Sequence, residues 1–260
     1  MTVRGKVAMV TGGASGLGKA AAERLAREGA KVAILGRSAA ENQQVADAIN
    51  AAGGEALPVN ADISDPAVMQ RAVEQVVGRW GRLDIVFANA GVNGVWAPIE
   101  DLTPEEWQQT ININLNGTFY TIKYATPHLK QQGGSIIITA SVNGTRIFSN
   151  TGATAYSCTK AAQVAMAKML ALELAKHKVR VNVICPGAIE SQIDENTEKR
   201  NVEREKEPVE FPDGQIPLTD GAPGKAEDVG DLVLFLASDQ SKHISGTEIW
   251  IDGAQSLLQG

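Results

Sequence analysis

The sequence is poor in the residues that build metal centres and disulfide scaffolds. Its 260 residues include two cysteines, Cys158 and Cys185, and three histidines, and these form neither a CxxC nor an HExxH pattern. We therefore predict that the chain has no metal site. Two isolated cysteines in a chain without an export signal indicate reduced thiols, and we interpret Cys158 as a small packing residue.

Long hydrophobic runs and an excess of basic charge are also absent. No apolar stretch approaches the ~20 residues of a membrane span. The opening MTVRGK is followed by VAMV, which is too short for the core of a signal peptide. The formal net charge of −6 argues against a nucleic-acid partner. We therefore expect a cytoplasmic protein that acts on a small molecule and binds neither nucleic acid nor a membrane.

What the sequence does contain is an alternation of short β-rich runs with longer helical patterns. Runs such as KVAIL and SIIIT are apolar on both faces, which is typical of a parallel sheet that is covered on both sides. The predicted strands span 6–10, 31–35, 55–60, 83–88, 134–140, 179–185 and 247–252. The predicted helices lie near 17–28, 39–52, 65–79, 103–131, 153–176 and 226–238. This order predicts an α/β fold with a doubly wound, Rossmann-like parallel sheet of about seven strands and helices on both faces.

One segment interrupts the alternation. Residues from about 186 to 225 are rich in charge, proline and glycine, and they are far more numerous than a strand-to-helix loop requires. We expect a substrate lid at about 188–223. No linker or internal repeat divides the chain, so we predict a single dinucleotide-binding and catalytic domain over 1–260.

A glycine-rich stretch, TGGASGLG (11–18), directly follows the first predicted strand. Glycines here permit a tight turn and close approach to a ligand, and the next helix offers its first N–H groups to an anion. The expected coenzyme contacts in this stretch are Gly12, Ser15, Gly16, Leu17 and Gly18. A rival pattern, the GxxxxGK of a nucleotide-triphosphate loop, also needs Ser or Thr at position 20, where the chain has Ala20.

The end of the second predicted strand indicates which coenzyme is used. Dinucleotide sites often place Asp or Glu here to hold the adenosine ribose hydroxyls. This chain has Gly36 followed by Arg37, and the first carboxylate afterwards is Glu41. A guanidinium pairs well with a 2′-phosphate, so the sequence favours NADP(H) over NAD(H). An arginine that lies on the surface without a coenzyme role is the alternative.

Six motifs stand in a fixed order along the chain. They are TGGASGLG, FANAG (87–91), ININLNG (111–117), IIITAS (136–141), AYSCTK (155–160) and ICPGAI (184–189). Together they resemble the short-chain dehydrogenase/reductase family over essentially the whole chain. The resemblance implies hydride transfer between NADP(H) and a carbonyl or secondary alcohol, as in 3-oxoacyl-carrier-protein reductases and broad carbonyl reductases. The alternatives are an NAD(H)-dependent sugar or alcohol dehydrogenase of this family and a dinucleotide-sensing regulator without catalysis.

The spacing of Tyr156 and Lys160 places both side chains on one helix face. A nearby cation favours a phenolate, and moving a phenol from pKa ~10 toward ~7 requires about 4 kcal/mol of differential stabilisation. The resemblance implies that Tyr156 is the general acid/base and that Lys160 also holds the nicotinamide ribose. It further implies that Ser141 hydrogen-bonds the reacting oxygen and that Asn114 holds a proton-relay water.

The resemblance also implies further coenzyme contacts and an assembly. The expected contacts are Asp62, Ile63, Asn89, Ala90, Gly91, Pro186, Gly187, Ile189 and Ser191. The small residues of 153–176 suit close helix contact, and together with the resemblance they predict a homo-oligomer, a tetramer. Candidate substrate-pocket residues outside the lid are Trp96, Asn143, Arg146, Phe148 and Asn150.

Overall fold

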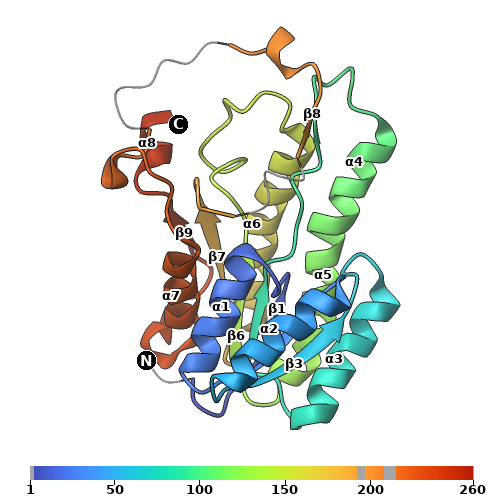
Figure 1. Cartoon of the computed structure of the whole chain (residues 1–260), viewed down its shortest axis with the longest axis vertical. Coiled ribbons are helices and arrows are strands. Elements are labelled where there is room, and N and C mark those ends of the chain that lie inside the picture. Colours follow the sequence, from blue (N-terminus) through green and yellow to red (C-terminus); the bar gives the residue numbers. More distant parts are fainter. Residues whose placement is uncertain (1–2, 192–196, 208–214, 260) are drawn as a thin grey trace.

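The computed structural model is built on a parallel seven-stranded sheet, and it describes residues 3–191, 197–207 and 215–259 (Figure 1). The strand order is β3-β2-β1-β4-β6-β7-β9, and every neighbouring pair is parallel. The strands are β1 (Val7–Thr11), β2 (Lys31–Gly36), β3 (Glu55–Asn60), β4 (Ile85–Ala88), β6 (Gly134–Thr139), β7 (Val179–Pro186) and β9 (Glu248–Ile251). The predicted α/β fold is therefore confirmed.

Helices cover both faces of the sheet and enclose two hydrophobic clusters. Helices α1 (Gly16–Arg27), α2 (Ala39–Ala51) and α7 (Ala226–Ala237) pack on one face. Helices α3 (Pro66–Trp80), α5 (Gly117–Leu129) and α6 (Thr154–Ala175) pack on the other. Alternate residues of β1 feed the two clusters, Val7 and Met9 on one face and Ala8 and Val10 on the other, as a strand buried on both faces requires.

The stretch predicted as one helix over 103–131 contains a π-helical segment. Helix α4 (Pro104–Ile111) continues into η1 (Asn112–Asn116) and then into α5. A capping box is present at the start of α4, where the Thr103 side chain accepts from the Glu106 N–H and the Glu106 carboxylate accepts from the Thr103 N–H. Asn114 lies within this π-helical segment. Such segments are frequent at functional sites.

The lid segment contributes a small second sheet that the sequence patterns did not predict. Strand β5 (Val95–Trp96) pairs in parallel with β8 (Glu198–Lys199). The remaining short helices are η3 (Val202–Arg204), η4 (Pro217–Thr219), η5 (Asp239–Ser241) and α8 (Gln255–Gln259). Two stretches of the predicted lid, 192–196 and 208–214, lie outside the described residues. Within the described part of the chain, no helix is both long enough and apolar enough to cross a bilayer, and the cytoplasmic location stays a prediction.

Candidate active site

The glycine-rich turn forms a cradle at the carboxyl end of β1. Gly12 and Gly16 have φ values of 65° and 47°, which L side chains rarely adopt. A Cβ on Gly18 would overlap the main-chain oxygen of Gly12, so helix and turn pack at a distance only glycine allows. Ser15 occupies the N-cap of α1 without a side-chain capping bond. The first N–H groups of α1 and the Ser15 hydroxyl therefore suit the pyrophosphate of a dinucleotide.

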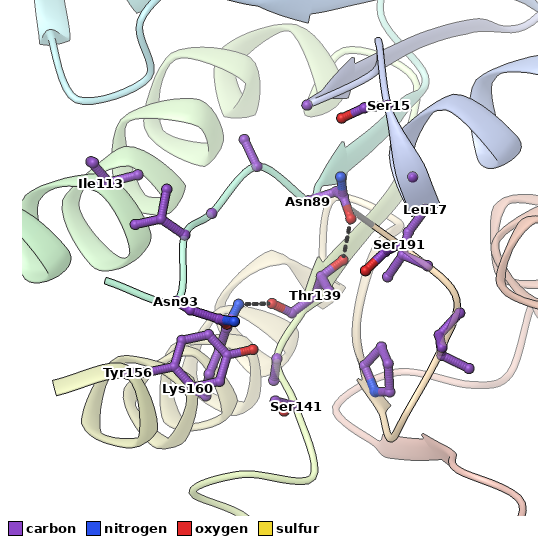
Figure 2. Close-up of a pocket in the computed structure, with 18 of the residues that line it drawn as sticks. Ser15, Leu17, Asn89, Asn93, Ile113, Thr139, Ser141, Tyr156, Lys160 and Ser191 are labelled. Carbon is purple, nitrogen blue, oxygen red and sulfur yellow. Dashed lines mark hydrogen bonds between the residues drawn. The ribbon is translucent and has the colours of Figure 1, made fainter. Parts of the chain in front are cut away.

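A cleft of about 990 Å³ runs from this turn across the carboxyl edge of the sheet. It is lined by most of the residues predicted to bind coenzyme: Gly12, Ser15, Gly16, Leu17, Arg37, Asp62, Ile63, Asn89, Ala90, Gly91, Pro186, Gly187, Ile189 and Ser191. Tyr156, Lys160 and Ser141 line the same cleft, and Figure 2 shows them on its far side from Ser15 and Leu17. Two predicted residues, Gly18 and Asn114, support the cleft without lining it.

Lys160 is buried against the sheet beside the phenol. Its Nζ donates a 2.8 Å hydrogen bond to the carbonyl oxygen of Thr139 (Figure 2) and lies 5.3 Å from the centroid of the Tyr156 ring. Burial lowers the pKa of Lys160 to about 8, although the neighbouring Cys185 opposes the shift. The Lys160 ammonium, the cation that would favour the Tyr156 phenolate, is thus close to the phenol ring. Its own protonation state changes near pH 8.

Ser141 and Tyr156 present their hydroxyl groups to the cleft from different elements. Ser141 follows β6, and its Oγ accepts a 3.1 Å hydrogen bond from the Asn143 N–H, so the hydroxyl proton can be donated to a ligand. Tyr156 lies in the first turn of α6 and is 8% exposed. Two oriented hydroxyls on one face of the cleft can both hydrogen-bond a carbonyl oxygen.

Asn114 is fully buried behind the cleft, in the π-helical segment. Its amide pairs with the main chain of Val92, accepting from the N–H at 2.9 Å and donating to the carbonyl at 2.8 Å. Its own carbonyl oxygen accepts hydrogen bonds from Thr118 and Gln163. These contacts make Asn114 a positioning residue for the 91–93 turn, while its hold on a relay water stays a prediction.

The coenzyme end of the cleft contains both signs of charge, and we define it as Gly12, Ala14, Ser15, Gly16, Leu17, Gly36, Arg37, Glu41, Asp62 and Ile63. Burial raises the pKa of Asp62, but hydrogen bonds from Ser64 and the charge of Arg37 outweigh it, and the net pKa is lowered. Arg37 lines the coenzyme end of the cleft and is exposed. A guanidinium in this place is free to meet an added phosphate group.

Asn42, which the sequence patterns did not single out, explains the glycine at position 36. Its Nδ2 donates to the carbonyl oxygens of Gly36 (2.9 Å) and Val59 (3.1 Å). A Cβ on residue 36 would lie 2.7 Å from Asn42 Oδ1. The buried amide therefore occupies the space in which a carboxylate at the end of β2 would begin.

The floor of the cleft connects three strands. Thr11 Oγ1 accepts from the N–H groups of Asn89 and Ala90, and Thr139 Oγ1 donates to Asn89 Oδ1 at 3.2 Å (Figure 2). Opposite, the 186–191 loop is tied to the C-terminal segment, because Gln255 Oε1 accepts from the Ala188 N–H at 2.9 Å. This hydrogen bond anchors the loop that carries Pro186 and Gly187, whose contact with the nicotinamide stays a prediction.

The substrate end of the cleft, defined as Asn93, Trp96, Asn143, Asn150 and Lys199, differs in part from the sequence-based expectation. Trp96 lies next to Tyr156, with ring centroids 6.5 Å apart. Asn93 was missed, whereas Lys199 belongs to the predicted lid without having been singled out, and its place depends on the pairing of β5 with β8.

Two predicted pocket residues and one cysteine have other surroundings. Arg146 stacks on the Trp250 ring at 3.6 Å, and Phe148 is 75% exposed, so neither lines the cleft. Cys158 is exposed rather than packed, because position 158 lies on the outer face of α6 within this chain. Burial raises the pKa of Cys185 to about 12, so this thiol stays protonated. Among the described residues, no cluster of His, Cys, Asp and Glu could hold a metal ion.

Known proteins match this chain over nearly its whole length. Residues 12–254 match the family model described as enoyl-(acyl carrier protein) reductase. The chain belongs to the short-chain dehydrogenase/reductase family. It is 37% identical to a 3-oxoacyl-[acyl-carrier-protein] reductase of Thermotoga maritima, over 97% of this chain and 98% of the relative. The crystal structure of a 3-ketoacyl-ACP reductase from Sinorhizobium meliloti 1021 superposes with a TM-score of 0.94 at 54% identity, covering 97% and 99% of the two chains.

Two further short-chain dehydrogenase/reductase structures were solved with coenzyme. A 3-ketoacyl-(acyl-carrier-protein) reductase from Brucella melitensis was complexed with NADH; it is 32% identical with a TM-score of 0.86, over 98% of this chain and 100% of that one. A short-chain dehydrogenase from Burkholderia cenocepacia J2315 was complexed with NADP. It is also 32% identical, with a TM-score of 0.84, over 97% of this chain and 98% of that one. The protein is therefore an NAD(P)-dependent oxidoreductase that acts on CH–OH or C=O groups, as predicted, and the comparisons leave the coenzyme preference undetermined.

Proposed function

We propose that this protein transfers hydride between NADP(H) and a carbonyl or secondary alcohol, using Ser141, Tyr156 and Lys160 with Asn114 in support. The observation that carries the proposal is the convergence of Tyr156, Lys160 and Ser141 on one cleft that begins at the glycine-rich turn. The catalytic domain we propose covers 1–260. A regulator without catalysis would not need an ammonium buried beside a phenol.

The chemistry assigned to the side chains follows from their contacts. The bound coenzyme supplies or accepts the hydride. Ser141 donates a hydrogen bond to the substrate oxygen, and Tyr156 passes a proton to that oxygen during reduction or removes one during oxidation. Lys160, beside the ring, stabilises the phenolate that forms when Tyr156 gives up its proton. Asn114 fixes the main chain of Val92, which lines the cleft.

The preference for NADP(H) is supported by Arg37 and by the space that Asn42 fills. Arg37 is exposed at the coenzyme end, where it can form a charge-assisted pair with a 2′-phosphate. An acid in place of Gly36, which would repel that phosphate and hold a 2′-hydroxyl, would bring its Cβ to 2.7 Å from Asn42 Oδ1 and force that side chain to shift. NAD(H) is the alternative coenzyme.

A panel of ketones and alcohols, followed at the nicotinamide absorbance with each coenzyme, tests the proposal. We expect oxidation or reduction of at least one member, with kcat/KM higher for NADPH than for NADH. Failure to turn over any neutral or charged member with either coenzyme would count against the assigned chemistry.

We also propose a homotetramer. Helix α6 exposes Met169 (74%) and Leu172 (85%), and α5 exposes Phe119 (46%), so apolar side chains of two neighbouring helices face outward in the single chain. Light scattering at micromolar concentration should give four times the 27.5 kDa of one chain. A particle of single-chain mass would rule this assembly out.

A further inference from the structure

The substrate end of the cleft contains one charged side chain among the described residues. The other charged residues that line the cleft are Lys160, beside the phenol, and Arg37, Glu41 and Asp62 at the coenzyme end. Lys199 alone carries charge where a substrate would extend away from Tyr156. No described carboxylate lines this part of the cleft to neutralise it.

The pairing of β5 with β8 fixes where Lys199 points. Trp96 and Lys199 are register partners in this parallel pair, so their side chains share a face of the small sheet. The Lys199 ammonium lies 5.1 Å from the centroid of the Trp96 ring, and that ring lies 6.5 Å from the Tyr156 ring. These distances connect the ammonium, across the indole, to the ring of Tyr156.

The acids nearby are already paired with other cations. Arg200, whose side chain points to the opposite face of the strand, binds Glu106 through both terminal nitrogens at 2.9 and 2.8 Å. Arg204 pairs with Glu100 at 2.7 Å and with Asp101 at 3.3 Å. Within residues 3–191, 197–207 and 215–259, Lys199 forms no ion pair. In the described part of the chain, its ammonium is therefore placed against the Trp96 ring and not against a carboxylate.

The groups around Lys199 suit oxygen-rich ligands rather than plain hydrocarbons. Asn143 and Asn150 line the same end and are hydrogen-bonded to each other, from Asn150 Nδ2 to Asn143 Oδ1 at 2.6 Å. The Asn93 amide donates to Thr197 Oγ1 at 2.7 Å, which draws the start of the β8 segment toward the cleft. The Asn143 amide nitrogen and the Lys199 ammonium line the same cleft and are both hydrogen-bond donors, and a carboxylate accepts several hydrogen bonds.

We propose that Lys199 is a specificity-determining residue that binds the carboxylate of the substrate, and that the substrates are small oxo acids and the corresponding hydroxy acids. The inference rests on the proposed function and adds the substrate class. In the reduction, the carbonyl carbon gains the hydride and its oxygen gains the proton from Tyr156, while the carboxylate is unchanged. The indole of Trp96 would cover the carbon chain between the two polar ends.

Matched acids and esters test this inference. Acetoacetate and levulinate are compared with their methyl esters in the wild type and in Lys199→Met, which keeps the length of the side chain and removes the charge. We expect the acid-to-ester ratio of kcat/KM to fall about 10- to 100-fold in the variant, the range of one charge-assisted hydrogen bond. Added salt should lower the wild-type ratio, because the ammonium is exposed and its field is screened.

Lys206→Met is the matched control, because Lys206 belongs to the same segment, pairs with Glu203 and does not line the cleft. A ratio that is the same in wild type and Lys199→Met overturns the inference, as does a wild type that uses the esters at least as well as the acids. Dihydroxyacetone phosphate, a ketone with a phosphate in place of the carboxylate, is a further probe. If Lys199→Met lowers kcat/KM for this ketone but not for the two acids, the carboxylate assignment is overturned. Turnover of esters alone would overturn the substrate class and leave the proposed hydride transfer standing, whereas no turnover of any probe would count against both.

Discussion

The coenzyme end and the substrate end of the cleft are built in different ways. The coenzyme end is formed largely by main chain at the carboxyl edge of the sheet, where glycine geometry and buried strands leave little freedom. The substrate end is assembled from side chains of separate segments, held by a two-residue strand pair and by ion pairs of Arg200 and Arg204. The first construction favours one constant ligand, and the second allows the ligand to differ between relatives.

The largest expected effect lies where the two ends meet. Tyr156→Phe removes one hydroxyl and little volume, so kcat should fall about 10²- to 10⁴-fold, the usual worth of positioned acid–base catalysis. Coenzyme affinity, measured by fluorescence titration with NADPH, should stay close to that of the wild type. Tyr124→Phe, a change on α5 outside the cleft lining, serves as the control. Near-normal turnover in Tyr156→Phe would mean that another group transfers the proton.

The next prediction concerns the coenzyme end alone. Arg37→Ala should reduce the ratio of kcat/KM for NADPH to that for NADH about 10- to 100-fold, because one charge-assisted contact to phosphate is lost. The KM of the organic substrate should stay unchanged in Arg37→Ala. Steady-state kinetics with each coenzyme measure both quantities, and an equal use of the two coenzymes that Arg37→Ala leaves unaltered would refute the assignment.

A third prediction follows from the buried ammonium between the two ends. Lys160 loses its proton above about pH 8 in the folded chain, whereas in the unfolded chain it keeps the proton up to about its ordinary value of 10.5. Between these values the unfolded chain binds more protons, so the contribution of Lys160 to the free energy of unfolding rises with pH, by at most about 1.4 kcal/mol per pH unit.

Denaturant unfolding of the wild type and Lys160→Met, at one protein concentration, measures this contribution. Lys160→Met should be the more stable protein at pH 7, since it avoids burying a charge. Its advantage should shrink between pH 8 and pH 10. A difference in unfolding free energy that does not change over this range would contradict the lowered pKa.

The smallest effect is expected at the substrate end. Arg200→Ala removes the bidentate contact to Glu106, the carboxylate whose pKa that contact holds at about 2. The β8 segment should then be held less firmly, and the KM of the organic substrate should rise several-fold at saturating coenzyme. Lys206→Ala is the control. A change in the KM of NADPH instead would mean that the two ends are coupled.

The sequence was informative where local pattern decides the structure. The spacing of Tyr156 and Lys160 predicted a shared helix face, and the apolar runs around Ile34 and Ile137 predicted strands buried on both sides, because helix and strand periods act over a few residues. Strand boundaries differ from the predictions by one or two residues, as between 83–88 and the observed β4 (Ile85–Ala88).

The sequence was uninformative where contacts link distant positions. Lys199 lies in a charged, irregular segment, and its place in the cleft depends on a two-residue strand that pairs with residues about a hundred positions earlier. The π-helical segment around Asn114 leaves no periodic signal, and the outer position of Cys158 on α6 could not be read from its spacing to Tyr156. Asn42 was missed because its role depends on its fit against Gly36.

The contact between Gly36 and Asn42 has an evolutionary consequence. A lineage that carries this pair gains an acid at position 36 only if the Asn42 side chain shifts, since the new Cβ would lie 2.7 Å from its Oδ1. Shrinking residue 42 first would remove the two hydrogen bonds that join Gly36 and Val59. The effects of substitutions at positions 36 and 42 should therefore not be additive, so the gain of an acid that would hold the adenosine ribose is coupled to a neighbouring position.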